Sequence, residues 1–265
     1  MQPRLLLVTI LRLIAGTVQL TAHAQSVGSP YLPAAPVLSA GPVQANPFES
    51  EVTALQARLL LAPVATSPIV FYGSSSIRLW KSLQQDFSGY AVLNVGLGGS
   101  RLTDCVQYAN KLVIPRKPAA IVIYAGENDL ALGIAPETVF SSFQKLFAIF
   151  RSYSPSIPIA FVSVKPSPAR LIFLGNFLKF NQLVRDFLKT QPETDYIDVF
   201  DDMLGQDHKP VLDLFVNDHI HLSPAVTRSC AGILENFFPR IVPYASSAKR
   251  NPNPDHQSRD PLTFI

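Results

Sequence analysis

Apolar and polar positions alternate in blocks along this chain. Five short runs, rich in Val, Ile, Phe or Tyr, have the length and composition of buried strands. They cover residues 68–72, 91–95, 119–125, 157–164 and 194–200. Between the later runs, apolar residues recur at intervals of three and four, which predicts helices over residues 136–152, about 173–189 and about 224–238.

Strands without polar alternation, separated by helices, indicate a parallel sheet that is covered on both faces. We therefore predict a three-layer α/β/α fold with a flavodoxin-like parallel sheet of about five strands. In such sheets, functional residues gather beyond the carboxyl ends of the strands, where the strand order reverses. This topology places Cys105 and Cys230 on opposite faces of the sheet, so we expect two unpaired thiols.

The domain predicted over residues 48–244 is flanked by segments of different composition. Residues 1–24 have a basic start, an apolar middle and an Ala-His-Ala ending, which predicts a cleaved signal peptide and export to the periplasm or the extracellular space. An uncleaved membrane anchor is the alternative, although Arg12 splits the apolar run; we expect no stable membrane insertion after cleavage. Residues 25–47 are predicted to be a Pro/Ala-rich linker and residues 245–265 a disordered tail.

Composition and charge narrow the possible functions. The chain has 265 residues, 48% of them hydrophobic, which is enough for a full core. Its net charge is +3; without Arg4 and Arg12 of the first segment, 20 basic residues face 19 acidic ones, a net charge of +1. The chain therefore lacks the excess of basic residues that is expected of a protein that binds nucleic acid.

Candidate chemistry follows the first three predicted strands. The run Gly73-Ser74-Ser75-Ser76 leads into a helical turn, where a serine either caps the helix or offers its hydroxyl as a nucleophile. The glycine-rich run NVGLGGS at 94–100 lets the backbone approach a ligand, and it lacks the spacings of phosphate-binding loops. In the run GEND at 126–129, the side-chain amide of Asn128 is expected to point into the same crevice.

A possible base stands just before the last predicted helix, in the run Asp218-His219-Ile220-His221. A nucleophilic serine needs a base, and the base needs an acceptor on its second nitrogen. The spacing lets the Asp218 carboxylate fold back on the imidazole of His221, whereas His219 is expected to point elsewhere. Two histidines and one aspartate make a weak metal site, so we expect neither a metal nor a cofactor.

Taken in order, these blocks resemble the SGNH hydrolase superfamily, also called GDSL esterases and lipases. The matching runs are GSS at 73–75, NVGLGGS at 94–100, GEND at 126–129 and DHIH at 218–221. The runs FYGSSSIRLW, YAGENDLALG and VSVKPSPAR further resemble a branch with a GSSS serine block. Ser74 stands where aspartate is usual, so any role of that aspartate is unavailable here.

The resemblance implies a role for each matched position. Ser75 is the nucleophile, His221 the base and Asp218 the residue that orients it. The oxyanion hole is formed by the backbone N–H groups of Ser75 and Gly99 and by the amide of Asn128. By contrast, we expect three other polar residues of these loops to lie at the rim or to face solvent, namely Glu127, Lys165 and Arg170. Trp80 is expected to pack in the core.

The implied function is a serine esterase that hydrolyses carboxylic esters through an acyl-enzyme. Its substrates would be small-molecule, glycan or lipid esters, with short-chain or O-acetyl esters favoured because no long apolar lid segment stands out. An acyl- or acetyltransferase that uses the same serine is one alternative, and a non-catalytic module that binds envelope glycans is another. An α/β-hydrolase is disfavoured because Ile77 occupies the second glycine position of its G-x-S-x-G elbow.

Overall fold

The structure is a computed structural model that describes residues 48–61 and 67–238. The predicted signal peptide, the linker and the tail after residue 244 lie outside these described residues.

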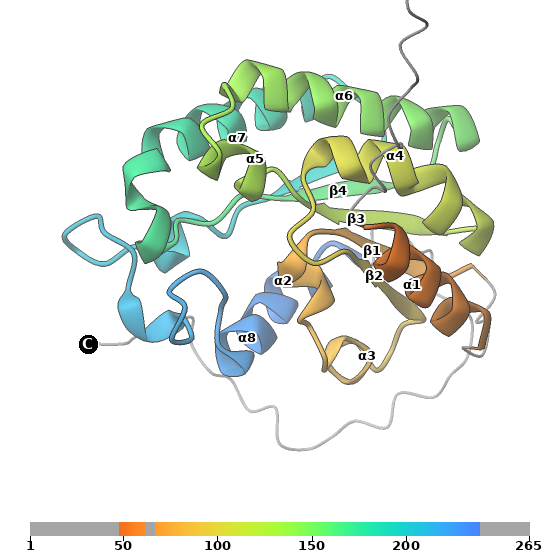
Figure 1. The fold of residues 1–265 in the computed structure, drawn as a ribbon, viewed down its shortest axis with the longest axis horizontal. Coiled ribbons are helices and arrows are strands. Elements are labelled where there is room, and N and C mark those ends of the chain that lie inside the picture. The colour runs from red at the N-terminus through yellow and green to blue at the C-terminus, as the bar shows by residue number, and fades with distance from the viewer. Residues whose placement is uncertain (1–47, 62–66, 239–265) are drawn as a thin grey trace, which may run out of the picture. The chain divides into compact units, whose positions relative to one another are not determined.

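Five parallel strands form one sheet in the order β2-β1-β3-β4-β5 (Figure 1). They are β1 (Ile69–Gly73), β2 (Val92–Gly96), β3 (Ala120–Tyr124), β4 (Ile159–Val162) and β5 (Thr194–Ile197). In the register of the sheet, Phe71 of β1 lies between Asn94 of β2 and Val122 of β3. This arrangement confirms the predicted flavodoxin-like sheet, and its order reverses between β1 and β3.

Strands β4 and β5 are shorter than predicted because side chains replace strand pairing at their ends. The Asn181 amide accepts a hydrogen bond from the Val164 N–H and donates one to the Val164 carbonyl, which removes this residue from the ladder. The Ser163 hydroxyl likewise accepts the N–H of Val199, two residues beyond β5. The chain therefore turns away from the sheet at its carboxyl edge.

Helices pack on both faces of the sheet (Figure 1). One face is covered by α1 (Glu49–Leu61), α4 (Leu102–Leu112), α6 (Pro136–Tyr153) and α7 (Leu174–Leu188), and the other by α2 (Ser75–Arg78), α3 (Leu83–Asp86) and α8 (Pro224–Glu235). The short helix α5 (Glu127–Ala131) follows β3 directly. The 3₁₀ turns are Ile114–Arg116, Pro168–Phe173, Asp201–Met203 and Leu212–Leu214.

The sheet separates two hydrophobic cores because successive side chains of a strand point to opposite faces. Val70 and Tyr72 pack on the face of α4, α6 and α7, while Ile69 and Phe71 pack on the face of α8. Trp80 lies in the second core, with its ring centroid 5.7 Å from that of Phe71, as predicted.

The two cysteines follow the same division. Cys105, on α4, is buried in the first core, and Cys230, on α8, packs against the second. Both thiols are unpaired, which confirms the prediction made from the topology.

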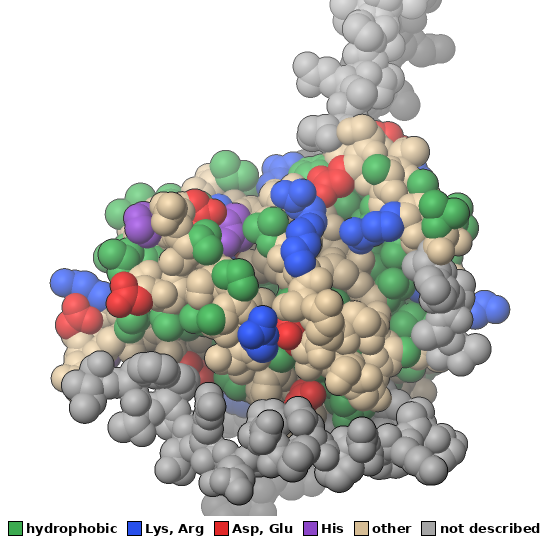
Figure 2. All heavy atoms as spheres, turned by 90° about the horizontal axis from the view of Figure 1, so that it is seen from below, with side chains coloured by type: hydrophobic (Ala, Val, Ile, Leu, Met, Phe, Trp, Pro, Cys, Tyr) green, Lys and Arg blue, Asp and Glu red, His purple; other side chains and the backbone are tan. Residues whose placement is uncertain are grey.

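The surface on the side of α3 and α8 carries charges of both signs, scattered among apolar and uncharged groups (Figure 2). None of the helices in residues 48–61 and 67–238 has both the length and the apolar character needed to span a bilayer.

Gly73 closes β1 at the point where the serine run begins. Its φ is +147°, and a Cβ added there would lie 1.8 Å from the carbonyl oxygen of Tyr124 on the neighbouring strand. Backbone on both strands would have to move to admit any side chain, so the position requires glycine.

We predict that Gly73→Ala lowers the free energy of unfolding by about 3 kcal/mol or more, because steric overlap and strain act together. Gly89→Ala is the matched control, since nothing lies within 4 Å of a Cβ added at Gly89. It should change the free energy by less than about 0.5 kcal/mol. Urea denaturation measures both variants, and equal effects would contradict this account of β1.

Candidate active site

The serine run forms the junction between β1 and α2. Ser74 is the N-cap residue of α2, yet its side chain makes no capping hydrogen bond. Ser75 begins the helix, and its Oγ lies 2.7 Å from Nε2 of His221. A serine at this junction can either cap the helix or act as a nucleophile. The Ser75 hydroxyl contacts an imidazole, which fits the second role.

The imidazole of His221 is held from its other side by Asp218. The distance from His221 Nδ1 to Asp218 Oδ2 is 2.6 Å, while Asp218 Oδ1 accepts the backbone N–H groups of Ile220 (2.8 Å) and His221 (2.9 Å). Partial burial acts to raise the pKa of Asp218, but these hydrogen bonds outweigh it and lower the pKa to about 2. The carboxylate is therefore ionised at neutral pH.

The loop that carries this pair is fixed by its backbone. The His221 carbonyl accepts the N–H of Val216 at 2.8 Å, and the Ser223 hydroxyl caps α8, where Pro224 takes the first helical position. His219 has a positive φ of 54°, and the imidazole that contacts Ser75 and Asp218 belongs to His221 and not to His219.

The glycine-rich loop after β2 lies beside the serine run. The Gly73 carbonyl accepts the N–H of Leu97 at 2.8 Å and the Ser100 hydroxyl at 3.4 Å. Gly99 has a φ of +73°, in the left-handed region, and nothing lies within 4 Å of a Cβ added there. Its backbone thus borders open space, where a ligand can approach closely.

Asn128 joins the same unit from the first turn of α5, directly after β3. Its Nδ2 donates to the Ser100 carbonyl at 3.0 Å, and its Oδ1 accepts from Arg170 Nη2 at 2.9 Å. These two bonds determine which side of the amide is nitrogen. A carboxamide nitrogen carries two hydrogens, so one remains to donate to a ligand.

These contacts bring together the residues selected from the sequence. Ser75, His221 and Asp218 form a continuous chain of hydrogen bonds. The glycine-rich loop that carries Gly99 is bonded to Asn128 of α5 and to Gly73 of the serine run. No group of three or more His, Cys, Asp or Glu side chains within the described residues is placed to hold a metal ion. A hydroxyl beside an oriented imidazole is suited to proton transfer and nucleophilic attack.

Comparison with protein families found a match over most of the described residues. The model of the GDSL-like lipase/acylhydrolase family matches residues 68–228, which span all five strands and all the residues above. The chain belongs to this family. The search of curated proteins found no significant match.

Solved structures of GDSL-like and esterase proteins share the fold. A GDSL-like lipase from Bacteroides thetaiotaomicron superposes with a TM-score of 0.61 at 17% identity, covering 73% of this chain and 98% of that one. A carbohydrate esterase family 3 protein from Talaromyces cellulolyticus superposes with a TM-score of 0.55 at 14% identity, covering 66% of this chain and 97% of that one. A lipase/acylhydrolase from Enterococcus faecalis superposes with a TM-score of 0.54 at 18% identity, covering 67% of this chain and 98% of that one.

In this member of the GDSL-like family, two of the three polar residues expected at the rim, Glu127 and Lys165, are buried instead, and Arg170 is partly buried. Glu127 is 3% exposed and Lys165 is 1% exposed, and the Arg170 side chain is mostly buried. Lys165 Nζ lies 2.5 Å from Glu127 Oε2, and Arg170 Nη1 lies 3.0 Å from Glu127 Oε1. Two cations thus share one buried carboxylate, which also accepts hydrogen bonds from the hydroxyls of Tyr124 and Ser167.

The buried cluster reaches the site through Arg170. Burial acts to raise the pKa of Glu127, but the charges of Lys165 and Arg170 and the hydrogen bonds outweigh it, so the pKa is lowered. Glu127 is therefore an anion that anchors Arg170, and Arg170 in turn holds Asn128 Oδ1. Sequence reasoning missed this connection because a charged residue in a loop usually faces water.

Two further carboxylates support the glycine-rich loop. Asp129 accepts the Leu102 N–H at the start of α4, at 3.0 and 3.2 Å, and Glu51 of α1 accepts the Gly98 N–H at 2.9 Å. The position of Asp129 in the GEND run was the one available signal for its role. Helix α1 itself was not predicted; only Val52, Leu55 and Leu59 of its thirteen residues are buried.

The raised pKa of Asp129 predicts that this residue contributes to stability in a pH-dependent way. Burial raises its pKa to about 6, despite hydrogen bonds from the backbone, and the residue is 2% exposed. Between the ordinary pKa of about 3.9 and this value, the folded state binds a proton that the unfolded state does not. Stability from this group is therefore present at low pH and is lost as the pH rises through this window.

The quantity to follow is the difference in free energy of unfolding between the wild type and Asp129→Asn. We predict that this difference falls by up to about 3 kcal/mol as the pH rises from about 4 to about 6. Asp186→Asn is the control: Lys189 and Gln182 lower the pKa of exposed Asp186, so its difference should stay constant or grow as the pH rises. Urea titrations across this range measure both differences. A rising difference for Asp129 would contradict the assignment.

Proposed function

We propose that this protein is a serine esterase that hydrolyses carboxylic esters through an acyl-enzyme on Ser75. The observation that supports it most directly is the 2.7 Å contact between Ser75 Oγ and His221 Nε2, two residues 146 positions apart in sequence. Membership of an acylhydrolase family supports ester chemistry independently of this geometry.

In the proposed reaction, Ser75 Oγ attacks the ester carbonyl carbon while His221 Nε2 accepts the hydroxyl proton. Asp218 keeps the proton on Nδ1 and stabilises the imidazolium that forms. His221 then gives its proton to the leaving alcohol, and the acyl group remains on Ser75. Water, activated by the same imidazole, attacks the acyl carbon and releases the acid, which restores the serine.

The carbonyl oxygen becomes negative during each attack. We propose that it is stabilised by the backbone N–H groups of Ser75 and Gly99 and by the free N–H of Asn128. The Ser75 N–H lies at the start of α2, where helix N–H groups lack partners within the helix. Donors held in place beforehand need no reorganisation as the charge develops.

For the acyl group we propose a short chain, such as acetyl. An acetyl esterase that shares the fold, with a TM-score of 0.52 at 12% identity, motivates this choice. So do the segments at the carboxyl edge of the sheet, which form the short helices α2 and α5 and 3₁₀ turns without a long apolar lid segment in the described residues.

We predict that Ser75→Ala loses hydrolysis of p-nitrophenyl acetate down to the uncatalysed background, because no other hydroxyl contacts His221 among the described residues. Ser74→Ala is the matched control, since Ser74 is the adjacent serine and its side chain makes no cap bond. It should retain activity within about tenfold of wild type. Full activity of Ser75→Ala would refute the proposed nucleophile, and assays with added alcohols show whether water is the preferred acceptor.

A second prediction concerns Asn128 and the residue that holds it. Asn128→Ala should lower kcat by about a hundredfold to a thousandfold, the usual effect of losing one oxyanion donor. Arg170→Ala should lower kcat by about tenfold to a hundredfold with little change in KM, because Asn128 loses its orientation. Arg170→Lys should restore activity only partly, since one ammonium cannot replace a fork that spans Glu127 and Asn128.

Arg151→Ala provides the control for losing a part-buried guanidinium. Arg151 donates to the carbonyls of Ile157 and Pro192, which precede β4 and β5 at the opposite edge of the sheet. This variant should lose stability while keeping kcat. If Arg170→Ala changes the melting temperature alone, Arg170 is not a positioning residue.

A further inference from the structure

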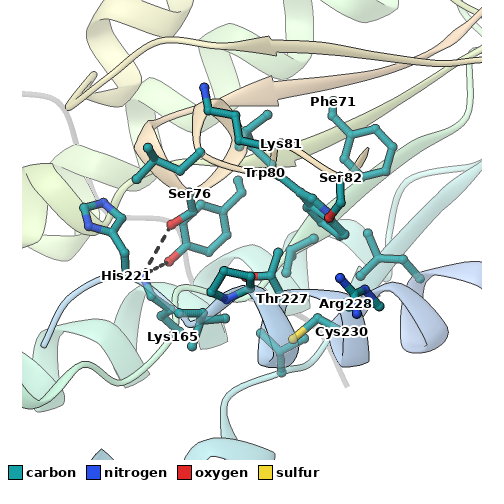
Figure 3. Close-up of a pocket in the computed structure, with 18 of the residues that line it drawn as sticks. Phe71, Ser76, Trp80, Lys81, Ser82, Lys165, His221, Thr227, Arg228 and Cys230 are labelled. Atoms are coloured by element: carbon teal, nitrogen blue, oxygen red, sulfur yellow. Dashed lines mark hydrogen bonds between the residues drawn. The ribbon is translucent and has the colours of Figure 1, made fainter. Parts of the chain in front are cut away.

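A large apolar cavity lies between the sheet and α8, on the side of the site where His221 stands. Its volume is about 420 Å³, within the range of about 300–1,000 Å³ that is typical of pockets for small ligands. Phe71 and Val122 of the sheet form one wall, and Thr227, Cys230 and Leu234 of α8 form the opposite wall. In Figure 3 the His221 ring lies at one end of the group of lining side chains, and Phe71, Arg228 and Cys230 lie at the other.

Two of the three cationic side chains that line this cavity have partners, and the third, Lys81, is exposed at the surface. Lys165 is paired with Glu127 and also contacts the hydroxyls of Tyr124 and Ser76, as the dashed lines of Figure 3 show for the last two. Arg228 is paired with Asp86 at 3.3 Å. Burial raises the pKa of Cys230 to about 11, so its thiol is neutral at pH 7. The cavity therefore suits a hydrocarbon chain better than a charged ligand.

The position of the cavity relative to the reacting groups indicates whether the acyl part or the alcohol part of an ester would lie in it. His221 and Ser76, the residue after Ser75, line the cavity, whereas Gly99 and Asn128 do not. In an attack by Ser75, the carbonyl oxygen points to Gly99 and Asn128, and the leaving oxygen must lie within reach of His221 Nε2. The alcohol part of the ester, which is attached to the leaving oxygen, therefore lies on the side of the cavity.

We infer that this cavity binds an apolar chain on the alcohol side of the ester, so that the substrates are short-acyl esters of long-chain or otherwise apolar alcohols. This inference rests on the proposed hydrolysis at Ser75 for its functional meaning. Binding of the chain itself does not require that hydrolysis, which allows the two to be tested separately.

Trp80 supplies a built-in reporter of binding. It is the one tryptophan of the chain, it lines the cavity, and its Nε1 is fixed by a 2.6 Å hydrogen bond to Asp86. Bromine quenches tryptophan fluorescence on contact. Decanol with a terminal bromine should quench Trp80 in a saturable manner, unbrominated decanol should reverse the quenching, and propanol with a terminal bromine should have little effect.

Cys230→Phe fills the cavity, and Ser229→Phe adds the same side chain at the adjacent exposed position of α8, outside the cavity. Quenching by bromodecanol should disappear in Cys230→Phe and persist in Ser229→Phe, with circular dichroism confirming that both are folded. Absence of saturable quenching in wild type, or equal quenching in both variants, would overturn the inference. The wild-type arm stands even if Cys230→Phe fails to fold.

Kinetics then test the alcohol side specifically. From butyl to octyl acetate, kcat/KM should rise by about tenfold or more, since each buried methylene contributes up to about fourfold. From ethyl butanoate to ethyl octanoate it should not rise, and Cys230→Phe should abolish the rise in the acetate series. A rise confined to the acyl series would overturn the inference. Quenching without any hydrolysis would instead refute the proposed function and leave the binding site standing.

Discussion

The hydrogen bond between Ser75 and His221 is the interaction on which the whole site depends, and the sheet makes it possible. Parallel strands all end at the same edge, so loops that are distant in sequence meet there. Ser75 follows β1, and His221 stands immediately before α8, which packs on one face of the same sheet. The order β2-β1-β3 also sets the glycine-rich loop and Asn128 on either side of the serine run.

A second set of interactions keeps these loops from moving independently. Asp129 ties α5 to the start of α4, and Arg170 connects Asn128 to the buried Glu127. Removing one member of such a buried ionic group leaves an uncompensated charge, which is strongly destabilising. The molecule therefore carries buried charges behind its site, and we interpret their role as holding the Asn128 amide in one orientation.

The parallel sheet was predictable from the apolar pattern of its strands, and the opposite placement of Cys105 and Cys230 followed once a flavodoxin-like strand order and right-handed crossovers were assumed. The pairing of Asp218 with His221 was also predictable, since three positions in a turn bring the side chains together. The burial of Glu127 and Lys165 was not, because a single charged residue in a loop reads as solvent-exposed unless its distant partner is known. The cavity has no linear signature at all, since it arises from how α8 packs on the sheet.

The central claim is that the hydroxyl of Ser75, and not that of a neighbouring serine, is activated by His221. The most direct measurement is reaction of the folded protein with a fluorophosphonate, followed by mass spectrometry of the peptide that contains Ser74, Ser75 and Ser76. The account predicts one phosphonyl group per chain, located on Ser75 and lost when His221 is replaced by alanine. Modification of Ser74 or Ser76, or labelling that persists without the imidazole, would contradict it.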